Sequence, residues 1–219
     1  YGGGIPKLDS TRRVIDVITI ITELATTIQS KMTEENGRCQ RMKDFALQFC
    51  PKAVFMLEHI DKLGCAVPQD FWVCKPCGQN THKIAGGFMN AENNTETETP
   101  QVVLCEDAIF DQNHLSETMV HELVHAYDSC RADLSLSNLY QHACTEVRAS
   151  NLSGECSWKN EICRGNFGIK AQQKECVRRR AVLSLIGNPY CANSKQAEKV
   201  VEDVLERCLQ DTAPFDRNP

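Results

Sequence analysis

Two histidines four residues apart, His121 and His125, place the strongest constraint on how this chain can fold. Residues separated by four positions lie one turn apart on the same side of an α-helix, so both imidazoles reach one point only if this segment is helical. Residues 116–131 contain no Pro or Gly, and Ser116 precedes an acidic first turn. The sequence therefore predicts a helix over residues 116–131, capped by Ser116. Its apolar side chains predict burial in a core: Met119, Val120, Leu123, Val124 and Tyr127.

Glu122 directly follows the first histidine and completes the sequence His-Glu-Leu-Val-His. This pattern is typical of zinc peptidases, in which two neutral imidazoles hold Zn²⁺ and the glutamate acts as base on a water at the open coordination position. We therefore predict one catalytic Zn²⁺, with His121 and His125 as metal ligands and Glu122 as the catalytic base. The alternative is a buried amphipathic helix whose histidines are only hydrogen-bonded, and the placement of the glutamate favours the metal site.

A catalytic zinc ion needs a third protein ligand, which must come from elsewhere in the chain. Metzincins place a histidine six residues after the second one; Arg131 occupies that position, so this class is excluded. Another arrangement takes a glutamate from a following helix, and Glu146 fits it. His142 lies one predicted turn before Glu146 and is an alternative, as is Asp128, which could instead accept a hydrogen bond from an imidazole N–H. We favour Glu146 and leave the other two open.

The chain contains thirteen cysteines, which is unusual for a protein of a reducing compartment. We therefore predict an oxidising compartment and several disulfides, with at least one thiol left over because the number is odd. The alternative is a structural zinc site at Cys74-Lys-Pro-Cys77 completed by Cys65 and Cys105, and a single Cys-x-x-Cys pair favours it only weakly.

The remaining pattern predicts an α+β fold that is mostly helical. We expect a zincin-like metallopeptidase with a small antiparallel sheet, an N-terminal helical segment and two C-terminal helices, joined by disulfides. Either of the strands expected before the catalytic helix, at residues 86–90 or 101–105, could lie beside the cleft and offer a free edge to an extended peptide. We predict an N-terminal segment over residues 1–50 and a metallopeptidase domain over residues 51–219, together forming one compact unit. The expected helices cover residues 8–36, 39–50, 54–62, 138–152, 169–186 and 194–210, and the expected strands cover 71–74, 86–90 and 101–105.

The net charge argues against nucleic-acid binding, and the hydropathy argues against a membrane-spanning segment. The net charge of −5 argues against a protein that binds a nucleic-acid backbone, which normally carries a basic patch. No stretch reaches the about 18 apolar residues that span a bilayer, because the most apolar segment, Val14 to Leu24, is interrupted by Asp16 and Glu23.

Several separate segments together resemble one family. They are residues 121–131, 142–154, 176–184, 188–191 and 214–216. In this order they closely resemble the mitochondrial inner-membrane ATP synthase-processing metalloprotease family, whose animal members are also called Ku-binding protein. The resemblance covers residues from about 35 to 216, which makes it far more specific than the His-Glu-x-x-His pattern alone.

The resemblance implies an enzyme of the mitochondrial intermembrane space, attached peripherally to the inner membrane. It implies that the protein processes the N-terminus of the ATP synthase subunit 6 precursor and assists assembly of the ATP synthase membrane sector. The alternative is an assembly chaperone whose proteolytic site is dispensable. The partners are then the subunit 6 precursor and membrane-sector assembly intermediates, with no nucleic acid. The family's metal ligands and base are carried over to His121, His125 and Glu122.

Overall fold

The computed structural model describes residues 37–65, 67–78, 84–90, 99–157, 160, 162 and 169–219. Residues Cys39–Pro219 form one compact unit, to which the following description applies. The helix predicted for residues 8–36 lies outside the described residues, as do residues 91–98 between the second and third predicted strands. The predicted boundary at residue 50 stays a prediction.

Within the described ranges three short strands form one mixed sheet, in the order β1-β3-β2. Strand β1 (Trp72–Lys75) runs parallel to β3 (Gln101–Cys105), and β2 (Gly86–Met89) runs antiparallel to β3. The prediction of a purely antiparallel sheet is therefore wrong. Strands β2 and β3 follow one another in the chain as an antiparallel pair, and β3 is the central strand, with four of its five residues buried. As a result, β2 lies at an edge of the sheet.

Helix α3 (Gln112–Arg131) packs against β2, β3 and α2 (Pro51–Lys62). It begins four residues earlier than predicted, because the carboxylate of Asp111 accepts a hydrogen bond from the backbone N–H of His114 at 2.8 Å. Ser116 is not the cap, since its hydroxyl donates to the carbonyl of Gln112 inside the helix at 2.9 Å. The predicted core side chains of this helix are all buried: Met119, Val120, Leu123, Val124 and Tyr127.

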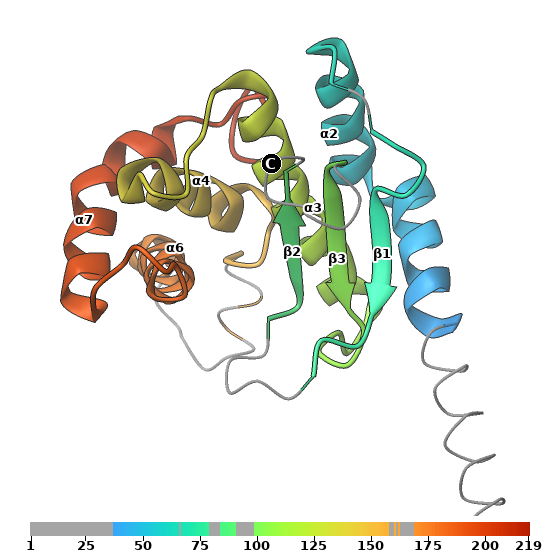
Figure 1. The fold of residues 1–219 in the computed structure, drawn as a ribbon, viewed down its shortest axis with the longest axis horizontal. Helices are drawn as coiled ribbons and strands as arrows, with labels where there is room; N and C mark the ends of the chain where they lie inside the picture. Colours follow the sequence, from blue (N-terminus) through green and yellow to red (C-terminus); the bar gives the residue numbers. More distant parts are fainter. Residues whose placement is uncertain are drawn as a thin grey trace, which may run out of the picture. The chain divides into compact units, whose positions relative to one another are not determined.

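In the described part of the chain three further helices pack on one another beside the β2 end of the sheet, and the first of them connects the others to α3 (Figure 1). They are α4 (Leu139–Leu152), α6 (Ile169–Ile186) and α7 (Ser194–Gln210), and they confirm the predicted helices at residues 138–152, 169–186 and 194–210. Asn138 and Asn193 cap α4 and α7 with their side-chain oxygens. Among the described residues, no helix is both long and apolar enough to cross a membrane.

Only one residue separates the first two described helices, whereas the sequence predicted a gap of three residues between them. Residues 37–49 are helical, and Cys50 is the extended N-cap residue of α2. Pro51 therefore opens α2 rather than only ending the preceding helix, because proline at the first helical position loses no hydrogen bond. The helix predicted for residues 54–62 is confirmed and starts three residues earlier.

Among the described residues five disulfides confirm the prediction of several disulfides. Cys65, Cys74, Cys77 and Cys105 all take part in them, so the structural zinc site considered for these four cysteines is excluded. Cys50 and Cys191 are outside these bonds, and Cys163 lies outside the described residues. The pairs are Cys39–Cys74, Cys65–Cys130, Cys77–Cys105, Cys144–Cys208 and Cys156–Cys176.

Candidate metal centre

Three side chains from two packed helices meet at one point. His121 and His125 come from α3 and Glu146 comes from α4, and one ligand atom of each lies within 4.8 Å of the others. The Nε2 atom of His121 lies 3.5 Å from Oε2 of Glu146, and Nε2 of His125 lies 3.4 Å from Oε1. Both imidazoles therefore present the same ring nitrogen to the same carboxylate, as the helical spacing of four residues predicts.

The other ring nitrogen of His125 is held by a hydrogen-bond chain. Its Nδ1 lies 3.0 Å from the hydroxyl oxygen of Thr145, and that hydroxyl donates to Oδ2 of Asp128 at 2.8 Å. Because the carboxylate of Asp128 only accepts, the hydroxyl proton points towards it and the hydroxyl oxygen accepts from His125 Nδ1–H. Burial lowers the pKa of His125 to about 4. Because Nδ1 is engaged in this chain, Nε2 is the ring nitrogen of His125 that faces Glu146.

The Nδ1 atom of His121 is likewise held by a hydrogen bond, in this case to a carboxylate. Its Nδ1 lies 3.1 Å from Oε1 of Glu155, which also pairs with Arg180. Burial opposes ionisation of Glu155, but His121 and Arg180 outweigh it and lower the pKa of Glu155 to about 2. Burial would lower the pKa of His121, yet the carboxylates of Glu155 and Glu146 raise this pKa well above its usual value. Binding of a cation at Nε2 therefore displaces a proton from this residue.

Glu146 is buried and ionised, which suits a metal ligand. Burial alone would raise the pKa of its carboxyl group, but His125, His121 and His142 together lower it well below its usual value. Two imidazole Nε2 atoms and one carboxylate, with both Nδ1 atoms occupied by acceptors, make a donor set that fits a divalent metal ion with a position left open for water.

His142 lies beside this cluster but carries its proton on the wrong nitrogen for a ligand. The amide of Asn188 is oriented by two backbone contacts, since its Oδ1 accepts from Tyr190 N–H at 2.8 Å and its Nδ2 donates to Leu136 O at 2.9 Å. The same Nδ2 lies 2.8 Å from Nδ1 of His142, which must therefore accept. The proton of His142 is consequently on Nε2, which donates to Oε1 of Glu146 at 3.3 Å.

Asp128, the other alternative for the third ligand, is engaged elsewhere. Its carboxylate accepts from Arg131 at 2.9 Å and from Arg148 at 3.0 Å, in addition to Thr145. It supports His125 indirectly rather than accepting directly from an imidazole. The geometry therefore favours Glu146 over His142 and Asp128, and the ligand set itself stays a prediction.

Glu122 is buried on α3 next to the edge strand β2. The backbone N–H of Phe88 donates to its carboxylate. Burial, reinforced by the carboxylates of Glu146 and Glu155, raises the pKa of Glu122 to about 7 despite the opposing effects of His121 and Phe88. A carboxyl group that titrates near neutral pH can both take and return a proton, as general acid–base catalysis requires.

Gly86 allows β2 to lie close to this carboxylate. A Cβ atom at position 86 would lie 2.7 Å from Cγ2 of Thr118 and 3.2 Å from Oε1 of Glu122. The missing side chain therefore sets the distance between the strand and the catalytic helix.

We expect Gly86→Ala to lower the free energy of unfolding by about 1–3 kcal/mol, the cost of an overpacked contact. Peptide hydrolysis should fall by about tenfold or more because Glu122 is displaced. The matched control is Gly87→Ala, where an added Cβ meets nothing within 4 Å. Urea unfolding and kcat/KM for a peptide substrate test both effects. Equal values for the two variants would contradict this role of Gly86.

Sequence patterns identified Asp128 as a possible supporting residue of this site, but they missed the side chains that contact the histidines. Thr145 and Asn188 lie in segments that carry the family resemblance, yet no spacing rule marks either as a partner of a histidine. Glu155 follows the end of α4 by three residues and reaches His121 only through the turn that starts there. The available signal was the buried polar character of α4, whose Thr145, Arg148 and Asn151 are all buried.

The chain is similar in sequence to one family of peptidases. The model of the Peptidase M76 family matches residues 37–216. A protein of Mycosarcoma maydis named mitochondrial inner membrane protease ATP23 is 38% identical over 203 residues, covering 84% of this chain and 92% of the relative. The protein of the same name from Emericella nidulans is 42% identical over 183 residues, covering 82% and 71%.

A vertebrate relative is similar to the chain over a comparable length. The mitochondrial inner membrane protease ATP23 homolog of Danio rerio is 37% identical over 195 residues, covering 88% of this chain and 72% of the relative. No solved structure matches the chain, so the zincin-like fold stays a prediction.

Proposed function

This chain belongs to the peptidase M76 family, and we propose that it is a zinc endopeptidase. The observation that carries the proposal is the convergence of His121, His125 and Glu146, with the ionisable Glu122 buried beside them. Two nitrogen ligands and one carboxylate are a donor set of catalytic zinc sites, which keep a fourth position open.

Each residue of the centre then has a defined task. His121, His125 and Glu146 would hold a zinc ion, which would supply Lewis acidity and a more acidic water at this position. Glu122 accepts the proton of the attacking water and returns it to the amine that leaves. Glu155 and Thr145 keep the proton of each ligand histidine on Nδ1, so that both Nε2 lone pairs stay directed into the site.

The substrate is an extended polypeptide that adds to the edge of β2. In the described sheet β2 pairs with β3 on one side only. Ala85 O accepts from Cys105 N at 2.9 Å, so the alternating pattern of an antiparallel pair turns the backbone groups of Gly86 and Phe88 away from β3. The contact between Phe88 N–H and Glu122 agrees with this direction. An edge of this kind brings a substrate strand next to the base.

We place the enzyme at the mitochondrial inner membrane, peripherally on the intermembrane-space side. Its relatives are named mitochondrial inner membrane proteases, and the five disulfides suit an oxidising compartment. The substrate that we propose is the N-terminal segment of the ATP synthase subunit 6 precursor, and the protein also assists assembly of the membrane sector. This part of the proposal is supported by the family resemblance.

Complementation of cells that lack the endogenous protein tests these roles separately. The native chain should restore both cleavage of the subunit 6 precursor and the amount of assembled ATP synthase. A Glu122→Gln chain should leave the precursor uncleaved, which immunoblotting detects. Full recovery of assembly by that variant would assign the assembly role to the body of the protein rather than to its peptidase site. Cleavage of the precursor by Glu122→Gln would contradict the proposed proteolysis.

A further inference from the structure

A buried arginine connects the C-terminal segment to the catalytic helix. Arg148 lies on α4 and is 1% exposed. Its Nε donates to Asp128 at 3.0 Å, and its Nη2 donates to the carbonyl of Ala213 at 2.6 Å. Its Nη1 donates to the carbonyl of Asp211 and lies 2.6 Å from Oδ1 of the same residue. One guanidinium group therefore spans the distance between α3 and residues 211–213.

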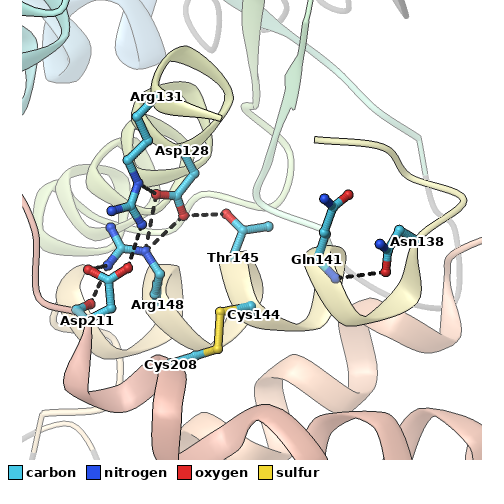
Figure 2. Close-up of a disulfide and its surroundings, with 9 residues drawn as sticks. All are labelled: Asp128, Arg131, Asn138, Gln141, Cys144, Thr145, Arg148, Cys208 and Asp211. Carbon is cyan, nitrogen blue, oxygen red and sulfur yellow. Dashed lines mark hydrogen bonds and ion pairs between the residues drawn. A yellow bond between two sulfur atoms is a disulfide. The ribbon is translucent and has the colours of Figure 1, made fainter. Parts of the chain in front are cut away.

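The geometry of these contacts requires an arginine. A buried charge is tolerated only when its donors are paired, and here the planar guanidinium serves a carboxylate on one side and two carbonyls on the other. Arg131 makes a parallel connection from α3, because it donates to Asp128 at 2.9 Å and to Asp211 at 2.6 Å. Figure 2 shows both guanidinium groups between the two aspartates.

Asp128 connects Arg148 to the metal ligand His125 through Thr145. Its Oδ2 accepts from the hydroxyl of Thr145, which in turn accepts from Nδ1 of His125 at 3.0 Å. Thr145 and Arg148 lie three residues apart on α4 and reach Asp128 from the same helix face, as Figure 2 illustrates.

The C-terminal segment is itself fixed at both ends. The ring of Phe215 stacks on that of Phe55 of α2, with centroids 4.9 Å apart and an interplanar angle of 17°. The Cys144–Cys208 disulfide fastens α7 to α4 three residues before Asp211 and next to Thr145. These contacts hold residues 211–215 against α2 at one end and close to α4 at the other.

We propose that the C-terminal segment Asp211–Phe215 positions the ligand His125, acting through Arg148, Asp128 and Thr145. Arg148 and Thr145 are positioning residues in this scheme, since neither touches the reacting atoms. The inference rests on the proposed zinc site and extends it to a segment that follows the last helix.

Thr145 offers the sharpest test because two substitutions separate its hydroxyl from its shape. In the full chain, Thr145→Val keeps the volume and removes the hydroxyl, whereas Thr145→Ser keeps the hydroxyl. Loss of a partner that orients a ligand imidazole costs about 10–100-fold in metal affinity. We expect Thr145→Val to raise the Kd for zinc by that factor and to shift the visible absorption spectrum of the cobalt-substituted protein. Thr145→Ser should stay close to the native chain in both measurements.

Phe215→Ala tests the C-terminal end of the same connection. Loss of the stacking contact should raise the Kd for zinc by about tenfold or more, with the free energy of unfolding of the metal-free chain measured alongside. The matched control is Phe49→Ala, which removes one ring of another aromatic pair, Phe45 and Phe49, with centroids 4.8 Å apart. This control should bind zinc as the native chain does.

Native zinc affinity in both Thr145→Val and Phe215→Ala would overturn the inference. It would leave the proposed function intact as long as the native chain bound zinc and His121→Ala did not. Absence of zinc binding by the native chain would refute both.

Discussion

Replacing Glu122 by Gln should reduce kcat/KM for peptide hydrolysis by about 10³-fold, within the range that general acid–base catalysis contributes. Glutamine has nearly the same size as glutamate but cannot accept the proton of the attacking water. Glu122 suits this task because burial raises its pKa to about 7, close to the pH at which a base and its conjugate acid are both available. Steady-state kinetics with a quenched fluorescent peptide measure the effect.

The loss must be chemical rather than structural for this interpretation to hold. Glu122 is outside the cluster of His121, His125 and Glu146, so its Gln variant should bind one zinc ion with nearly native affinity. The amide carbonyl of Gln can still accept from Phe88 N–H, which preserves the contact with β2. Glu117→Gln on the same helix is the matched control and should keep its activity. Activity of Glu122→Gln above about a tenth of native would contradict its role as base.

Removing the carboxylate of Glu146 should abolish tight zinc binding. The Kd of Glu146→Ala should rise by more than the about 100-fold that the loss of a supporting partner costs, because a ligand itself is lost. Peptidase activity should disappear with the metal. Competition with a coloured chelator measures the Kd, and urea unfolding of the metal-free protein checks that the buried substitution leaves the chain folded.

His142→Gln distinguishes the two candidates on α4. In the structure His142 donates from Nε2 to Glu146 and accepts from Asn188, so it supports the ligand without having a free lone pair. Its replacement should raise the Kd for zinc by about tenfold, within the range for a supporting residue. A larger loss in His142→Gln than in Glu146→Ala would exchange their roles.

Much of the helical framework follows from local sequence. The boundaries of α4, α6 and α7 agree with the predicted ranges within one residue, because amphipathic periodicity and capping residues such as Asn138 and Asn193 act over a few positions. The alignment of His121 and His125 is equally local, since it needs only a continuous helix. These parts of the fold are determined by neighbours in the chain.

The start of α3 and the strand directions depend on more than local sequence. Asp111 and Ser116 are both good capping residues, and nothing in the four residues between them ends a helix, so the pattern alone does not choose. The parallel pairing of Trp72 with Val102 joins two strands that are separated in the chain by β2, so the local pattern does not determine it. The pairing of thirteen cysteines likewise depends on which elements pack together.

The support of the metal ligands is the least predictable part of the site. Glu155 belongs to the turn after α4, Asn188 to the loop between α6 and α7, and Asp211 to the C-terminal segment. Each reaches the centre through tertiary packing of elements that are far apart in the sequence. A polar residue in such a segment has no periodicity that marks it, so only the three-dimensional structure identifies its partner.

Anomalous X-ray scattering at the zinc edge, from crystals of the zinc-loaded native chain, tests the proposed metal centre most directly. We expect one zinc peak per chain, bound by Nε2 of His121, Nε2 of His125 and the carboxylate of Glu146, with Glu122 beside the open position. A peak bound by His142 or Asp128 in place of Glu146, or no peak at this cluster, would contradict it.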